Sequence, residues 1–177
     1  MIPVVCIAGW SESGKTTFLE RLVPELKGRG LRVIVVKHTH EDADCDVPGK
    51  DSWRLARAGS DAVVLHAGKR LMINTLLPGP LGLDGVLSHV VGDFDLAVVE
   101  GFHDAGYPKI EVHRRGSNQP IRSAGADLLG MVTDEPLDVD VPQFTSDDVA
   151  GVADLITRKL LNRRRRQPAQ ETASIGG

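Results

Sequence analysis

The segment that decides the fold is Gly9-Trp-Ser-Glu-Ser-Gly-Lys-Thr16, which matches the phosphate-binding pattern G-x-x-x-x-G-K-[ST]. Its two glycines permit the backbone angles that turn amide N–H groups toward an anion. We expect Lys15 to reach the β- and γ-phosphates of a nucleoside triphosphate, and the Thr16 hydroxyl to bind Mg²⁺. An apolar run at residues 4–8 precedes the segment and a helical pattern follows it. This strand–loop–helix context predicts a P-loop.

Apolar runs typical of strands alternate with helical patterns along the rest of the chain. The alternation predicts an α/β fold: a three-layer P-loop NTPase with a mostly parallel sheet and an antiparallel edge or hairpin extension. The predicted strands are residues 4–8, 31–37, 62–67, 71–75, 96–99, 109–113 and 128–132, and the predicted helices are residues 16–29, 51–58, 84–91 and 147–163. Residues 109–113 alternate in polarity, which predicts an exposed edge strand. We expect Thr145 or Ser146 to cap the last helix.

The length of 177 residues suits one domain with a substantial core, predicted at residues 1–163. The composition beyond this domain is basic and then polar, so we expect a disordered tail at residues 164–177. A formal charge of −3 and the lack of a long apolar run argue against nucleic acid or a membrane as partners. Cys6 and Cys45 lie far apart and suggest no disulfide framework, which favours a cytoplasmic protein. Cys6 lies in an apolar run and is expected to be buried.

Two carboxylates are predicted at strand ends. Asp95-Leu-Ala-Val-Val-Glu100 is similar to a Walker B strand, in which the terminal carboxylate holds an Mg²⁺-bound water or orients the attacking one. Lys15 and Glu100 are therefore the candidate catalytic residues, and Thr16 and Glu100 the candidate metal ligands. Asp134 could accept a hydrogen bond from the edge of a guanine base. The chain has no N-K-x-D motif for guanine, so the residues alone leave GTP and ATP open.

The segment that starts at Lys37-His-Thr-His is dense in ligand-type side chains. Asp42, Asp44 and Asp46 resemble the opening of an EF-hand loop, but the required glycine is replaced by Val47 and the closing glutamate by Trp53. The spacing of the two histidines and Cys45 matches no common zinc site. Two interpretations stay open: a solvated acidic loop, or a switch-like loop that reaches the γ-phosphate and Mg²⁺.

Several segments, taken in order along the chain, resemble one family. They are residues 2–17, Lys37-His-Thr-His, Asp46-Val-Pro-Gly-Lys-Asp-Ser52, Arg57-Ala-Gly59, Val99-Glu-Gly-Phe102, Lys109-Ile-Glu111 and Val132-Thr-Asp134. Together they resemble the MobB family, the molybdopterin-guanine dinucleotide biosynthesis adapter proteins. Glu12 departs from the small residue expected at its position.

The resemblance implies a homodimeric GTP-binding protein with weak GTPase activity, acting beside the guanylyltransferase that attaches GMP to molybdopterin. The phosphate-binding residues it implies are Gly9, Trp10, Ser11, Glu12, Ser13, Gly14, Lys15, Thr16 and Thr17. Thr16 and Glu100 would serve Mg²⁺, and Asp134 would recognise the base. His38, Asp46 and Asp51 would belong to the switch-like loop, and Arg57 could meet the phosphate of an anionic pterin.

Two rival functions remain open from the residues. A small-metabolite kinase would need an arginine-rich lid, for which Arg114, Arg115 and Arg122 are scattered candidates. A metal-insertion GTPase would use the side chains of His38, His40 and Cys45.

Overall fold

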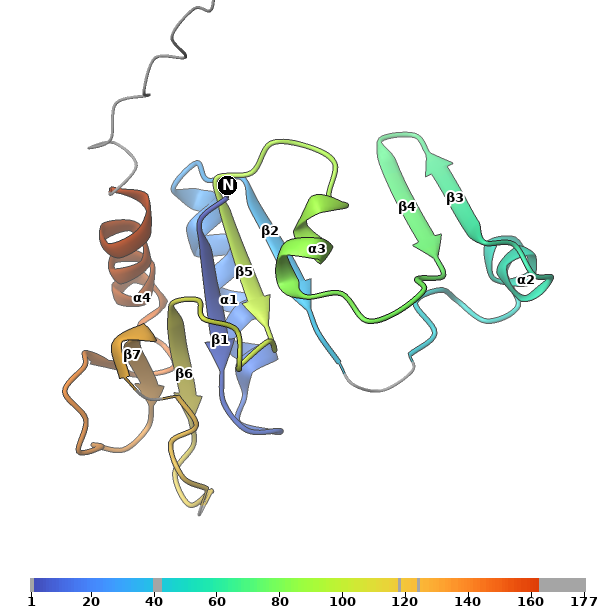
Figure 1. Ribbon diagram of the computed structural model, residues 1–177. Helices are drawn as coiled ribbons and strands as arrows, with labels where there is room; N and C mark the ends of the chain where they lie inside the picture. The colour runs from blue at the N-terminus through green and yellow to red at the C-terminus, as the bar shows by residue number, and fades with distance from the viewer. Residues whose placement is uncertain (1, 40–42, 118, 124, 163–177) are drawn as a thin grey trace, which may run out of the picture. The chain divides into compact units, whose positions relative to one another are not determined.

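The computed structural model describes residues 2–39, 43–117, 119–123 and 125–162 (Figure 1). The chain forms two compact units, Met1–His38 with Val91–Gly177, and Thr39–Val90. The predicted tail at residues 164–177 lies outside the described residues, as does His40.

The first unit is built on a six-stranded sheet in the order β2-β5-β1-β6-β7-β8, and every neighbouring pair of strands is parallel. The strands are β1 (Val4–Ala8), β2 (Val33–Lys37), β5 (Leu96–Glu100), β6 (Lys109–His113), β7 (Leu128–Thr133) and β8 (Gln143–Phe144). The prediction of a mostly parallel sheet is confirmed. Parallel strands deliver their C-terminal ends to one edge, where α/β sheets bind ligands.

Helices α1 (Lys15–Gly28) and α4 (Val149–Ile156) contact each other and pack on one face of this sheet. The core joins fully buried side chains such as Ile7 of β1, Leu22 of α1 and Leu155 of α4. A π-helical segment, Thr157–Leu161, continues α4, and a 3₁₀ turn, Gly125–Asp127, precedes β7. The predicted cap of the last helix is wrong: the Asp148 carboxylate accepts a hydrogen bond from the amide of Gly151 at 2.9 Å.

The prediction of an exposed edge strand at residues 109–113 is wrong. Strand β6 lies between β1 and β7, and its residues from Lys109 to Val112 are buried. The polar side chains are tolerated because the loops on either side of the strand supply hydrogen-bond partners. Lys109 donates to the carbonyls of Ala105 and Tyr107 at 2.7 and 3.0 Å. Glu111, with no exposed surface, accepts hydrogen bonds from backbone amides of the following loop.

The second unit contains α2 (Asp51–Arg57), β3 (Ala62–Ala67), β4 (Arg70–Thr75) and α3 (Leu83–Ser88). Strands β3 and β4 pair antiparallel across a turn with Gly68 at φ +59°, as predicted for a hairpin. Helix α3 ends before the predicted residue 91. No helix among the described residues is long and apolar enough to cross a membrane.

Candidate nucleotide-binding site

The loop after β1 needs glycine at its first position. Gly9 has φ +132°, and a Cβ atom added there would lie 2.4 Å from the carbonyl oxygen of Val112 and 2.8 Å from Ser13 Oγ. Gly14 has φ +92° and occupies the N-cap position of α1. Both glycines therefore allow a backbone that side-chain-bearing residues rarely adopt.

The N-terminus of α1 presents polar groups suited to an anion. No side chain caps the helix, so its first amides depend on other partners. Ser13 Oγ is buried and has no hydrogen-bond partner among the described residues. A phosphate oxygen would satisfy these donors and would favour the positive end of the helix dipole. The uncapped helix amides and the Ser13 hydroxyl therefore make this segment suited to a phosphate group.

Lys15 lies in a cationic environment at this loop. Its ammonium donates to the carbonyl oxygen of Trp10 at 2.5 Å. Burial is the main cause that lowers the pKa of Lys15; Glu100 opposes the shift, while the charges of Lys37 and Arg122 add to it. An incoming phosphate would supply the negative charge that the ammonium lacks here.

Thr16 and Glu100, the two predicted metal ligands, contact each other. The Thr16 hydroxyl donates to the two carboxylate oxygens of Glu100 at 3.0 and 3.2 Å. Glu100 ends β5 and is only 5% exposed. Lys37, at the end of the neighbouring strand β2, forms an ion pair with the same carboxylate. The hydroxyl and carboxylate are hard oxygen donors of the kind that Mg²⁺ prefers.

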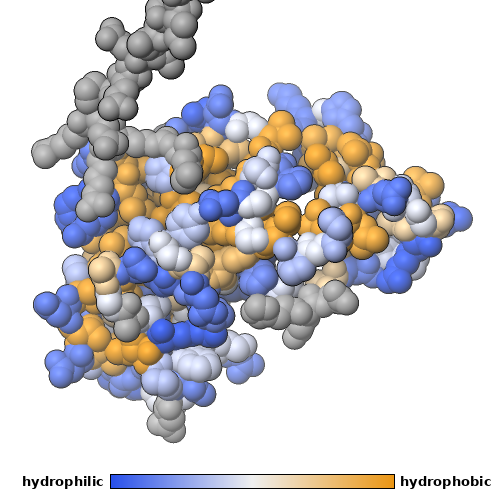
Figure 2. All heavy atoms as spheres, viewed as in Figure 1, coloured by the Kyte–Doolittle hydropathy of each residue, from blue (hydrophilic) through white to orange (hydrophobic). Residues whose placement is uncertain are grey.

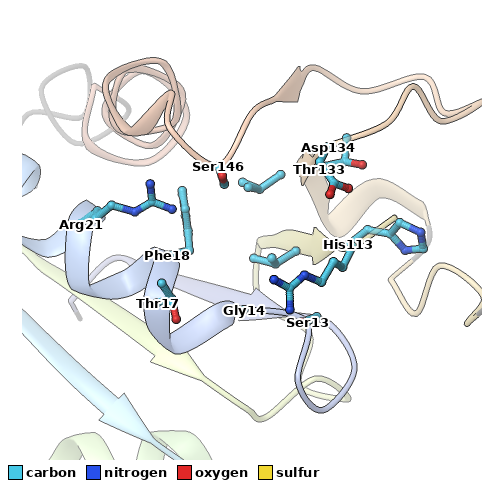
Figure 3. Close-up of a pocket in the computed structure, with 12 residues that line it drawn as sticks. Ser13, Gly14, Thr17, Phe18, Arg21, His113, Thr133, Asp134 and Ser146 are labelled. Atoms are coloured by element: carbon cyan, nitrogen blue, oxygen red, sulfur yellow. The ribbon is translucent and has the colours of Figure 1, made fainter. Parts of the chain in front are cut away.

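A pocket lies between the start of α1 and the ends of β6 and β7 (Figure 3). Asp134 lines it together with Ser13, Gly14 and Thr17 of the phosphate loop. One Asp134 oxygen accepts the backbone amide of Arg115 at 2.6 Å, which holds the carboxylate at this position. The predicted base-recognition residue and the phosphate loop therefore share one pocket.

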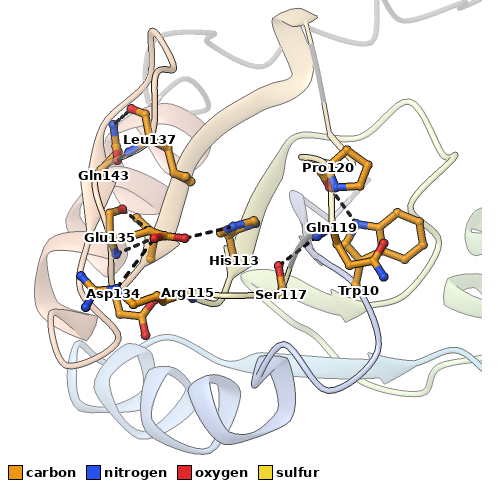
Figure 4. Close-up of polar contacts among 11 residues, drawn as sticks. Trp10, His113, Arg115, Ser117, Gln119, Pro120, Asp134, Glu135, Leu137 and Gln143 are labelled. Carbon is orange, nitrogen blue, oxygen red and sulfur yellow. Dashed lines mark hydrogen bonds and ion pairs between the residues drawn. The ribbon is translucent and has the colours of Figure 1, made fainter.

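The remaining loop residues lie on its outer side. Ser11 and Glu12 are exposed, and Glu12 has φ +62°, an uncommon conformation for a residue with a side chain. Trp10 Nε1 donates to the carbonyl oxygen of Pro120 at 2.8 Å (Figure 4). The loop is thereby fastened to the segment that follows β6.

His38 lies beside the end of β5. Its backbone amide donates to the carbonyl of Glu100 at 2.8 Å, and its ring stacks on Phe102 with centroids 4.2 Å apart. A Cβ atom at Gly101 would lie 2.8 Å from that of His38, so glycine permits this approach. The structure therefore places His38 next to the predicted metal ligand.

The other predicted residues belong to the second unit. Asp46 accepts the amide of Val47 at 2.7 Å, and its other oxygen is buried without a partner among the described residues. Asp51 lies in the first turn of α2, 3.7 Å from Arg54. Arg57 pairs with Asp44 at 3.3 Å and lies over the ring of Trp53. These contacts all lie within the second unit, so they do not bear on whether these residues take part in the phosphate site.

Lys37 and Glu111, two charged residues near the loop, were missed as site residues, and Arg122 was named only as a lid candidate of the kinase hypothesis. Lys37 had a signal, since it ends a predicted strand one position before His38. Glu111 and Arg122 had none, because their roles depend on the segment after β6 folding back beside the loop.

Comparison with known proteins gives a consistent result. A family model described as molybdopterin guanine dinucleotide synthesis protein B, MobB, matches residues 4–134. A molybdopterin-guanine dinucleotide biosynthesis adapter protein of Haemophilus influenzae is 40% identical over 160 residues, covering 90% of both chains. The protein of the same description from Escherichia coli is 37% identical over 161 residues, covering 88% of this chain and 92% of the relative.

Solved structures agree with these sequence relationships. A crystal structure of molybdopterin-guanine biosynthesis protein B superposes with a TM-score of 0.67 at 29% identity, covering 88% of this chain and 98% of that one. The crystal structure of Bacillus subtilis MobB gives a TM-score of 0.71 at 24% identity, covering 90% and 98%, which supports the fold alone. The predicted α/β class of a P-loop NTPase is confirmed.

Proposed function

The chain belongs to the MobB family, as an adapter protein of molybdopterin guanine dinucleotide biosynthesis, and from that premise we propose that it binds GTP with Mg²⁺ and hydrolyses GTP slowly. The observation that carries the proposal is the hydrogen bond from Thr16 to the buried carboxylate of Glu100, beside Lys15 and the uncapped start of α1. Together these groups supply donors for phosphate and oxygen ligands for a metal.

Each group has a defined role in the proposed complex. The loop amides and Lys15 bind the β- and γ-phosphates, and the Asp134 pocket receives the base, whose donors a carboxylate can accept. Thr16 and Glu100 would hold Mg²⁺, which neutralises charge on the β- and γ-phosphates when bound. Glu100 would also orient the attacking water.

Calorimetric titration of Lys15→Ala with GTP and with ATP tests this proposal. We expect the parent protein to bind GTP more tightly than ATP, and Lys15→Ala to lose measurable binding while its thermal unfolding is unchanged. Lys27→Ala, an exposed lysine in the last turn of α1, is the matched control and should bind normally. Unchanged affinity in Lys15→Ala would refute the proposed phosphate site.

The proposed partners follow from the adapter role. They are the guanylyltransferase that joins GMP to molybdopterin, and molybdopterin itself, with Arg57 as the candidate contact to its phosphate. Co-purification of the guanylyltransferase, with and without GTP, tests the first proposed partner. Molybdopterin binding that is lost in Arg57→Ala would support the second proposed partner and the contact to Arg57. We place this activity in the cytoplasm, in accord with two cysteines that form no disulfide.

A homodimer is the proposed assembly, and the hairpin of the second unit supports it. Val64 and Ile73 face each other across β3 and β4, and they are 61% and 50% exposed. Figure 2 shows hydrophobic residues gathered at the surface of this unit. A two-stranded hairpin is marginal without further packing, and exposed apolar patches often mark interfaces. Sedimentation that finds only monomer at micromolar concentration would refute the dimer.

The two rival functions gain nothing from the comparisons. Among the described residues no group of three or more His, Cys, Asp or Glu side chains could hold a metal ion, while His40 lies outside them. Of the three lid candidates of the kinase hypothesis, Arg115 lies 3.8 Å from Glu135 and Arg122 lies over Trp10. Rapid phosphate transfer that depends on an acceptor would revive the kinase hypothesis.

A further inference from the structure

Arg122 is a cation beside the phosphate loop that the proposed site does not use. It lies in the segment between β6 and β7, and its guanidinium carbon is 4.9 Å from the centre of the Trp10 ring. The same guanidinium contacts the ring nitrogen Nε2 of His103. Among the described residues, no carboxylate forms an ion pair with Arg122. An exposed arginine held by an aromatic face and an imidazole has weaker partners than a phosphate would offer.

The backbone around Arg122 is fixed although the side chain is exposed. Its amide donates to Glu111 Oε1 at 2.7 Å, and the amide of Ser123 donates to the other oxygen. Pro120 accepts the Trp10 indole at 2.8 Å, which ties the same segment to the phosphate loop. The guanidinium is therefore attached to a fixed backbone beside the loop, which limits the backbone entropy lost when the side chain binds a ligand.

Arg122 also lies within electrostatic reach of Lys15. Its charge is one of the causes that lower the pKa of Lys15, together with that of Lys37. The charges of Lys15, Lys37 and Arg122 thus repel one another, and the Glu100 carboxylate that offsets them is already shared by Thr16 and Lys37. A triphosphate would relieve the repulsion among them. Arginine suits its terminal phosphate because the guanidinium can donate two parallel hydrogen bonds.

We infer that Arg122 binds the terminal phosphate of the nucleoside triphosphate, and that it leaves the Trp10 ring to do so. The inference rests on the proposed function, since it assigns a further residue to the same phosphate site. It makes Arg122 the residue that distinguishes a triphosphate from a diphosphate. It also makes the fluorescence of Trp10 a reporter of the terminal phosphate.

The test uses Trp53→Phe protein, in which Trp10 is the sole tryptophan. GTP and GDP are titrated by calorimetry and by Trp10 fluorescence, with Mg²⁺ present. We expect Arg122→Ala to weaken GTP binding about tenfold or more, equivalent to about 1.4 kcal/mol. GDP binding should change less than about threefold, and the difference between the GTP and GDP fluorescence signals should disappear. Arg122→Lys should restore part of the preference for GTP.

The control is Arg158→Ala, which removes an equal charge from an exposed position on the helix after α4 and should change neither affinity. Unchanged GTP affinity in Arg122→Ala, or equal weakening of GTP and GDP, would overturn the inference and show that the arginine only packs on Trp10. Either result would leave the proposed function standing. If the parent Trp53→Phe protein bound neither nucleotide, the proposed function would fall first, and the inference with it.

Discussion

Replacement of Glu111 by glutamine tests how β6 holds the segment that follows it. The carboxylate is fully buried, and each of its oxygens accepts one backbone amide, from Arg122 and Ser123. Glutamine keeps the shape but turns one acceptor into an NH₂ donor, which then faces an N–H group. The loss of one hydrogen bond to a charged group costs about 1.5–3 kcal/mol, and the unsatisfied amide about 1–3 kcal/mol more. We therefore expect the free energy of unfolding to fall by about 2.5–6 kcal/mol.

Urea unfolding followed by circular dichroism measures this loss. Glu135→Gln is the matched control, because Glu135 is partly exposed and forms only loose ion pairs with His113 and Arg115, at 3.7 and 3.8 Å. Surface pairs of this kind contribute about 0–1 kcal/mol. A loss in Glu111→Gln no larger than that of Glu135→Gln would show that the buried carboxylate does not hold the segment.

Three further predictions concern Gly9, Cys6 and Lys15. Gly9→Ala should lower the free energy of unfolding more than Gly30→Ala. Both glycines have positive φ, but only at Gly9 would the added Cβ atom lie 2.4 Å from a carbonyl oxygen. Equal losses in urea unfolding would contradict this steric reason. Burial raises the pKa of Cys6 to about 11, so its thiol should not react with iodoacetamide in the native protein at pH 8. The native protein should take up one equivalent of the reagent, at the exposed Cys45, and the unfolded protein should take up two. A second equivalent in the native protein would contradict the burial of Cys6. Burial lowers the pKa of Lys15, and bound phosphate would raise it again. Triphosphate binding should therefore take up a proton at a pH between the pKa values of the free and bound protein, and should weaken as the pH rises through them. Calorimetry in two buffers of different ionisation enthalpy measures the uptake, and a count of zero protons would contradict this reasoning.

Much of the fold was predictable because the deciding patterns are local. The phosphate loop, the apolar strands beside it and the hairpin at Gly68 each depend on residues close together in the sequence. Strand β6 was predicted at its correct residues but at the wrong place in the sheet. Its alternation of Lys109, Ile110 and Glu111 is that of an exposed strand, and the carbonyls before it and the amides after it make those charges tolerable inside.

The same distinction applies to the site. Lys15, Thr16 and Glu100 were predictable, because a strand end and a helix start fix where such side chains must lie. The helix cap at Asp148 was missed because three neighbouring residues could also cap, and only the backbone geometry selects among them. Arg122 was named only as a scattered candidate, since its position depends on the contact between Trp10 and Pro120 across 110 residues of chain.

The pairing of Lys37 with Glu100 has a consequence for how the proposed site would fill. This carboxylate already has a counterion, and that counterion is tethered to strand β2. A magnesium ion entering alone would have to displace a neighbour that cannot diffuse away. Metal and triphosphate arriving together would instead give the released ammonium a new anion to contact. The proposed site would therefore resist free magnesium and would admit the metal as part of its nucleotide complex.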